Sequence, residues 1–241
     1  MRPFLTAEWR NLFIASYPVA PSLLERRLPP GLSLDIRDGS AFVSLVAFEF
    51  LQTRLGSPLL RIPARLVSRR NFAELNLRFY VRQGEQRGVV FIREFVPQRL
   101  VAWMARLLYN QPYLAAPLWA TRVDSADAIT MDYRLQFGGR EHRIQATGDK
   151  PAFRPGDDSV EHFFKEHHWG YGRTRSGQAI RYEVAHPVWD VYAVRSYKLD
   201  FDFAAVYGPE WDILQQAVPV STILAVGSPI GVFPKGELVS G

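Results

Sequence analysis

Residues 74–81 alternate polar and apolar side chains without interruption, and this pattern restricts the fold more than any other feature of the chain. Alternation with a period of two is typical of a β-strand, whose successive side chains point to opposite faces of a sheet. The apolar face is formed by Leu75, Leu77, Phe79 and Val81. The polar face is formed by Glu74, Asn76, Arg78 and Tyr80. A strand of this kind buries its apolar face against another layer, so we expect a β-sheet with a packed core.

Turn signals separate this strand from others. Asp38 and Gly39 lie between two apolar runs, at 32–37 and 40–50, and this arrangement predicts a hairpin because both turn positions favour positive φ. Patterning along the rest of the chain predicts further strands at 89–95, 129–137, 141–147, 195–206 and 222–226.

Helices are fewer. Residues 98–109 carry apolar side chains at helical spacing, Asp158 and Glu161 form a capping-box pattern for a short helix through His167, and Pro209 begins a third candidate that ends at 217. Strands dominate and hairpins join most of them. We therefore expect an α+β, β-rich fold, an antiparallel barrel or a closed pair of sheets with a few covering helices. With 241 residues and no linker, the chain is expected to form a single domain, residues 1–241.

Composition excludes several classes of protein. Hydrophobic residues make up 47% of the chain, enough for a full core. No apolar run approaches the roughly 20 residues of a membrane helix, and Glu8, Arg10 and Asn11 interrupt the N-terminal segment where a signal peptide would be apolar. The chain has no cysteine, which excludes disulfides and cysteine-based catalysis. We expect a cytoplasmic protein that does not enter a membrane.

The net charge of +5 comes mainly from arginine, because only four of the 29 basic residues are lysines. The densest basic cluster consists of Arg61, Arg65, Arg69 and Arg70. Nucleic-acid binding would require such a cluster within a recognised motif and interleaved with stacking aromatic residues, and neither condition is met. A solvated arginine-rich surface is the simpler interpretation, so no nucleic-acid partner is expected.

The histidine and glycine patterns support neither a metal nor a cofactor. His162 and His167 are five residues apart and do not share a helix face, and no His-Glu-x-x-His pattern occurs. These residues and His168 are expected to be surface or capping histidines. The Gly-x-Gly at 170–172 lacks a third glycine and a strand-to-helix setting, and no Gly-x-Ser-x-Gly is present. We expect no metal and no cofactor.

A lysine that forms a Schiff base has to be desolvated to be neutral at working pH. Lys150 and Lys235 lie in turn-like segments beside proline, Lys165 is expected on the polar face of a helix, and Lys198 shares a strand face with two aspartates. None of the four has the pattern of a buried reactive amine.

Several segments, taken in order, resemble the YqjF-like family of uncharacterised bacterial proteins, also called domain of unknown function 2071. The resemblance rests on the strand at 72–81, on Trp9, on the Leu-Pro-Pro-Gly-Leu segment at 28–32 with the Asp-Gly hairpin after it, and on the segments 109–113, 167–172 and 186–189. It covers nearly the whole chain.

That family belongs to the acetoacetate decarboxylase-like superfamily, which implies a β-rich cone or barrel around an internal pocket. In the decarboxylase a buried lysine forms the Schiff base, assisted by a glutamate and an arginine. The resemblance implies that Glu74 is the matching glutamate and that Tyr113 occupies the position of the lysine. The covalent mechanism of the decarboxylase is therefore not expected. The residues implied to line the pocket are Asn76, Arg78, Tyr80, Tyr113, His186 and Trp189.

Three functions remain open. The first is a pocket for a small acidic or carbonyl-bearing molecule held by Arg78 with Asn76 and Tyr113, in which Glu74 acts as acid or base in a non-covalent proton transfer, isomerisation or hydration. The second is a binding or sensor protein that uses the same pocket without turnover. The third is a structural or interaction protein with a filled barrel, fixed by a buried ion pair between Glu74 and Arg78. A homo-oligomer is compatible with all three.

Overall fold

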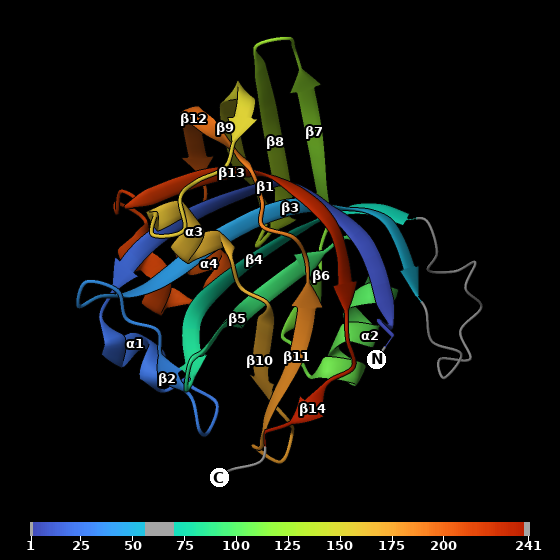
Figure 1. Ribbon diagram of the computed structural model, residues 1–241, viewed down its shortest axis with the longest axis vertical. Coiled ribbons are helices and arrows are strands. Elements are labelled where there is room, and N and C mark those ends of the chain that lie inside the picture. Colours follow the sequence, from blue (N-terminus) through green and yellow to red (C-terminus); the bar gives the residue numbers. More distant parts are fainter. Residues whose placement is uncertain (1, 56–69, 239–241) are drawn as a thin grey trace.

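The computed structural model describes residues 2–55 and 70–238 (Figure 1). Fourteen strands form one sheet in this part of the chain. They are β1 (Leu5–Val19), β2 (Ser33–Leu34), β3 (Ala41–Leu55), β4 (Arg70–Gln83), β5 (Gln86–Val96), β6 (Tyr113–Ala115), β7 (Leu118–Asp124), β8 (Ala128–Phe137), β9 (Arg140–Phe153), β10 (Trp169–Arg173), β11 (Ala179–Ala185), β12 (Val191–Asp200), β13 (Ser221–Val232) and β14 (Gly236–Glu237). The helices are α1 (Pro21–Glu25), α2 (Arg99–Tyr109), α3 (Val160–Lys165), α4 (Phe203–Tyr207) and the 3-10 helix η2 (Pro209–Leu214).

The sheet closes on itself. Its strands follow the order β11-β10-β5-β4-β3-β1-β13, and β13 pairs back with β11 at Val184–Val232 and Ala185–Gly231. From β13 the sheet continues through β12, β9, β8 and β7 (Figure 1). The predicted β-rich fold with a few short helices is thus confirmed, and the closure has the form of a ring of strands with an attached second layer.

Two pairings differ from the expected antiparallel arrangement. β5 runs parallel to β6 and to β10, whereas the other strand pairs are antiparallel. Parallel neighbours require a crossover connection instead of a hairpin. Helix α2 supplies that connection between β5 and β6.

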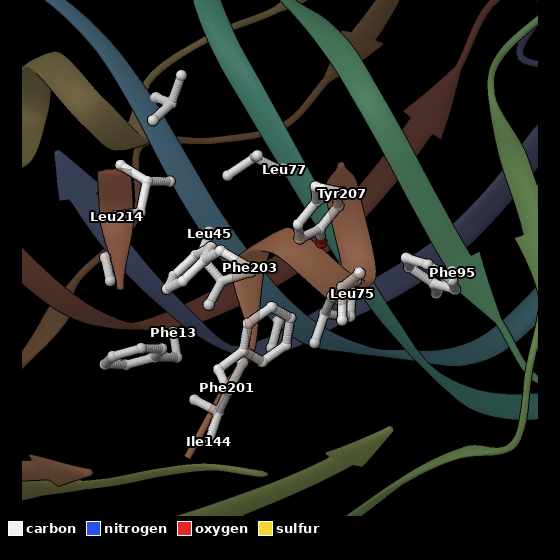
Figure 2. Packing of buried hydrophobic residues seen from close by; sticks show 14 of the residues in the cluster. Phe13, Leu45, Leu75, Leu77, Phe95, Ile144, Phe201, Phe203, Tyr207 and Leu214 are labelled. Carbon is white, nitrogen blue, oxygen red and sulfur yellow. The ribbon is translucent and has the colours of Figure 1, made fainter. Parts of the chain in front are cut away.

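Two hydrophobic cores lie on opposite faces of β4. The larger core packs the apolar face of β4 against residues from β8, β9, α4 and η2, and Figure 2 shows Leu75 and Leu77 near Phe203, Tyr207 and Leu214. The smaller core lies on the other face and includes Leu12, Ile14, Phe42, Val46 and Phe48. The polar face of β4 therefore points toward the smaller core and not toward bulk water.

The Asp-Gly turn is formed as predicted, with Asp38 at φ 50° and Gly39 at φ 77°. The strand expected at 32–37 is reduced to β2. The strand expected at 195–206 ends at Asp200, because the side chain of Asp202 accepts a hydrogen bond from the Ala205 amide and caps α4.

The predicted cap of the 158–167 helix is also wrong by one residue. Ser159 is the N-cap of α3, since its hydroxyl accepts a hydrogen bond from the His162 amide at 3.0 Å. The segment after Pro209 forms a 3-10 helix that ends at Leu214. Six of the described strands had no counterpart in the prediction: β1, β6, β7, β10, β11 and β14.

Among the described residues, no helix combines the length and apolar character needed to cross a membrane. Three members of the arginine cluster, Arg61, Arg65 and Arg69, lie outside the described residues.

Candidate functional site

A cavity of about 370 Å³ lies within the ring of strands. All seven strands of the ring contribute a lining residue: Trp9, Phe48, Glu74, Glu94, Trp169, Tyr182 and Val232. The volume falls in the range of roughly 300–1,000 Å³ that is usual for small-molecule sites. The interior is thus not filled by core side chains, in contrast to the filled barrel that one of the three alternatives required.

Glu74 lies on β4 at the polar side of this cavity and is 3% exposed. Its Oε1 accepts a hydrogen bond from Asn76 Nδ2 at 3.2 Å, and its Oε2 accepts one from Tyr113 Oη at 3.0 Å. Both hydrogen bonds favour the carboxylate, but burial outweighs them and raises the pKa of Glu74 to about 7. The group can therefore give or take a proton near neutral pH.

Glu94 is a second buried carboxyl group at the same place. Strand pairing puts it opposite Asn76 on β4 and opposite Tyr113 on β6, and it is 1% exposed. Burial and then the charge of Glu74 raise the pKa of Glu94 well above its ordinary value. Two such carboxyls cannot both ionise easily, so each favours the protonated form of the other.

Sequence reasoning missed Glu94. A signal existed in the sequence. The turn at 84–85 joins β4 to β5 as a hairpin, and counting residues outward from this turn along both strands brings position 94 close to position 76. A bulge between Leu77 and Arg78 shifts the register by one, which simple counting does not anticipate.

Tyr113 reaches Glu74 from the short strand β6. Burial, followed by the charges of Glu74 and Glu94, raises the pKa of Tyr113 well above its ordinary value. Its hydroxyl consequently stays protonated and acts as a hydrogen-bond donor to the carboxyl pair. The resemblance described above puts this phenol where the decarboxylase has its lysine.

Arg78 is the only arginine or lysine in the described lining of the cavity. It is 9% exposed, its Nη2 donates to the Phe164 carbonyl at 3.1 Å, and its Nε has no hydrogen-bond partner. The structural interpretation required an ion pair between Arg78 and Glu74, and the structure does not show one. Arg78 Nη2 donates to the Phe164 carbonyl, and the Glu74 carboxylate accepts hydrogen bonds from Asn76 and Tyr113.

His167 also lines the cavity, and its prediction as a surface or capping histidine is wrong. The residue is 8% exposed, its ring packs 4.9 Å from that of Tyr80, and neither ring nitrogen has a hydrogen-bond partner. Burial, and then the positive charges of Arg78 and Arg87, lower its pKa well below the ordinary value. The neutral imidazole can donate one hydrogen bond and accept another.

Three residues implied by the resemblance lie outside the described cavity lining. Tyr80 points the same way as Arg78, but its hydroxyl bonds to Ser44. Trp189 packs behind Trp9, with ring centroids 6.2 Å apart, and His186 stacks on Trp189 at 4.2 Å. Trp189 and His186 thus form a layer behind the cavity wall.

Lys165 is buried, with a side chain that is 0% exposed, so its expected place on a polar helix face is wrong. Helix α3 ends at this residue, and Glu166 leaves the helical conformation and pairs with its ammonium group. The Glu166 carboxylate also accepts a hydrogen bond from the Trp189 amide at 3.1 Å. None of the four lysines of the chain is among the described lining residues.

Glu166, His168 and His186 bring ligand-type atoms within 4.8 Å of one another. The two imidazole rings, however, stack at 4.4 Å with an angle of 23° between their planes. A metal ion bonds along the nitrogen lone pair, in the plane of each ring, and stacked rings do not direct both lone pairs to one point. The ammonium group of Lys165 already balances the carboxylate, so this cluster is organised as a stack.

The ring of strands and its internal cavity define a protein with an acetoacetate decarboxylase-like fold. The structure is similar to that of acetoacetate decarboxylase from Legionella pneumophila, with a TM-score of 0.65 and 16% identity over 99% of this chain and 88% of that one. It is also similar to an acetoacetate decarboxylase-like enzyme from Sphingomonas wittichii RW1, with a TM-score of 0.63 and 11% identity over 100% of this chain and 95% of that one. A third similar structure is the enduracididine biosynthesis enzyme MppR complexed with pyruvate, with a TM-score of 0.63 and 15% identity over 99% of this chain and 92% of that one.

The family profile of DUF2071, described as an uncharacterized conserved protein, matches residues 6–229, and the chain belongs to this family. The uncharacterized protein YqjF of Bacillus subtilis (strain 168) is 27% identical over 182 residues, which cover 74% of this chain and 70% of YqjF.

Proposed function

We propose that this protein binds a small carbonyl-bearing acid in the cavity and catalyses a proton transfer on it without a covalent enzyme–substrate bond. Glu74 is the proposed acid–base group. The observation that carries the proposal is the buried pair of carboxyl groups, Glu74 and Glu94, at the edge of a cavity that also holds Arg78. Buried ionisable groups with pKa values near the working pH are the usual instruments of proton transfer.

The proposed reaction assigns one role to each of these groups. The Glu74 carboxylate takes a proton from the carbon next to the substrate carbonyl, and the C–H electron pair moves into the carbonyl group to give an enolate. The Tyr113 hydroxyl and the Arg78 guanidinium supply positive potential for the oxygen that becomes negative. Glu74 then returns a proton either to the enolate oxygen, which gives the enol isomer, or to the carbon, which restores the substrate; in heavy water Glu74 exchanges its proton for a deuteron, and return to the carbon labels it.

Arg78 is the proposed partner of the substrate carboxylate. An arginine can bind a carboxylate through two parallel hydrogen bonds, and its Nε has no partner within the described part of the protein. The neutral His167 adds a donor close to the same cation. The related fold of MppR, whose structure holds pyruvate, supports a short carbonyl acid as a suitable head group for this pocket.

Deuterium exchange tests the proposed chemistry. Incubation of the protein with 2-oxobutanoate in heavy water should replace hydrogen on the carbon next to the carbonyl, as followed by proton NMR. Glu74→Gln should abolish the enzyme-dependent exchange while binding of 2-oxobutanoate, measured by calorimetry, is kept. Glu85→Gln is the matched control, because Glu85 is a 98% exposed side chain in the turn after β4. Binding without exchange by the wild-type protein would favour the sensor function instead.

A further inference from the structure

We infer that the preferred ligand is an acid with a long apolar tail, whose carboxylate lies at Arg78 and whose tail extends along the aromatic wall formed by β1 and β3. This inference rests on the proposed function only for the position of the head group. It concerns the class of ligand, which neither the family nor the similar structures specify.

The polar residues of the cavity gather on one side. Glu74, Asn76 and Arg78 come from β4, and Glu94 and Tyr113 come from β5 and β6, which follow β4 in the sheet. The wall on the other side of β4 is largely apolar. Its lining residues from β1 and β3 are Leu5, Trp9, Leu12, Val46, Phe48, Phe50 and Thr53, and the unpaired polar side-chain atoms among them are Trp9 Nε1 and Thr53 Oγ1. The cavity thus has a polar pole and an apolar wall.

The register of the strands gives the length of this wall. Val46 is paired with Asn76 at the polar pole, whereas Phe50 is paired with Phe72 and with Trp9 farther along. Asn76 and Phe72 are four residues apart on β4, so the distance between the two rows is about 13 Å at 3.3 Å per residue. Pyruvate, with three carbons, spans only the polar end of this distance.

Most of the wall formed by β1 and β3 offers no hydrogen-bond partner to water. Water needs two to four polar partners to be stable at a buried site, and the rings of Phe50 and Phe72, stacked at 4.8 Å, provide none. Trp9 closes this end by edge contacts with Phe48 and Phe50 at 5.0 and 5.6 Å. An aliphatic or aromatic tail would fill the space and bury its surface.

The charge of the polar pole requires an anion. Arg78 is the only arginine or lysine in the described lining and its Nε has no hydrogen-bond partner, while burial raises the pKa of both Glu74 and Glu94 and so weakens the negative charge beside it. A carboxylate supplies that partner, and a neutral lipid such as an alcohol does not. The ligand is therefore expected to combine one negative charge with an apolar tail.

Calorimetric titration with acetate, hexanoate, decanoate and decan-1-ol tests this inference. Each methylene transferred from water to the cavity should tighten binding roughly fourfold, so decanoate should bind on the order of a hundredfold more tightly than hexanoate. The alcohol should bind more weakly than decanoate. Equal affinity for acetate, hexanoate and decanoate would overturn the inference, and so would tighter binding of the alcohol.

A variant of β3 gives a second, independent test. Thr53 lines the cavity beyond Phe50, and Arg54 is exposed on the same strand. Thr53→Trp should fill part of the tail space and weaken decanoate binding at least tenfold with little effect on acetate, whereas Arg54→Trp should leave both unchanged. Thermal melts of both variants verify folding. Equal decanoate affinity in the two variants would place the tail elsewhere and overturn the inference.

The outcome is separable from that of the proposed function. Exchange of 2-oxobutanoate protons without any gain from a longer tail would refute the ligand class and leave the chemistry standing. A strong gain from the tail without exchange of 2-oxodecanoate protons would refute the chemistry and support the ligand class.

Discussion

Replacement of Glu74 by glutamine should stabilise the protein above neutral pH and flatten its stability between about pH 5 and pH 8. Burial raises the pKa of Glu74 from 4.5 to about 7, so over this interval the folded chain holds a proton that the unfolded chain releases. The contribution of Glu74 to stability is therefore complete below pH 4.5 and is lost as the pH rises through 7. A tenfold change in proton affinity is worth about 1.4 kcal/mol, which makes the loss about 3 kcal/mol.

The glutamine side chain fits the surroundings of Glu74. Its carbonyl oxygen can accept the hydrogen bond from Tyr113 that Glu74 Oε2 accepts in the wild type. Its amide group would then face Asn76, whose Oδ1 has no partner, and rotation of the Asn76 amide would pair the two. The variant thus removes the ionisable group without leaving a new unpaired polar atom.

Urea unfolding at a series of pH values, followed by tryptophan fluorescence, provides the free energies of unfolding. The wild-type protein and the Glu85→Gln control should lose stability in parallel from pH 5 to pH 8, and Glu74→Gln should lose about 3 kcal/mol less. The reasoning would be refuted if all three proteins followed parallel curves. Glu74 would then be ionised across this range in the folded state, and the proposed acid–base role would lose its physical basis.

Three further predictions concern other parts of the structure. Gly227→Ala should lower the free energy of unfolding in urea by several kcal/mol more than Gly139→Ala does. Both glycines have φ near 80°, where a Cβ atom costs about 1–2 kcal/mol, but only at Gly227 would the new Cβ lie 2.1 Å from the Trp9 carbonyl oxygen. Lys165→Met should lower stability by about 3–5 kcal/mol because it leaves the buried Glu166 carboxylate unpaired, and the double variant with Glu166→Gln should recover most of this loss in the same assay. Treatment with pyruvate and borohydride should leave the mass of the intact wild-type protein unchanged, since no lysine lines the described cavity; a mass increase that matches a reduced imine would contradict the non-covalent mechanism.

The polar face of β4 can be predicted from the sequence, because every second residue of a strand points to the same face and residues 74–81 alternate polar and apolar side chains. Whether that face meets water or a cavity is a property of the closed ring, in which β11 pairs with β13 across more than 40 residues of chain. No local pattern encodes this closure. The resemblance to a family supplied the missing information when it implied an internal pocket.

Two errors in the site, at His167 and Lys165, have a common physical origin. Helical spacing predicts their positions only where the helix continues, but α3 ends at Lys165, and the backbone of Glu166 adopts φ −99° and ψ 88°. The end of the helix changes the direction of every side chain that follows, so helical spacing no longer applies. Glu94 was missed for a different reason, since its strand carries large apolar residues and a single acidic residue among them does not stand out.

The resemblance implies that Tyr113 stands where the decarboxylase has a lysine, and such an exchange would change more than the loss of a nucleophile. A lysine ammonium beside Glu74 and Glu94 would favour their ionised forms and lower the pKa of both carboxyl groups. A phenol contributes no charge, so burial dominates and raises the pKa of Glu74 to about 7 while Glu94 stays protonated. The same exchange would leave Arg78 as the only cation for the anionic ligand that we propose. On this proposal, a single substitution within the fold separates a site suited to imine formation from one suited to proton transfer on a bound acid.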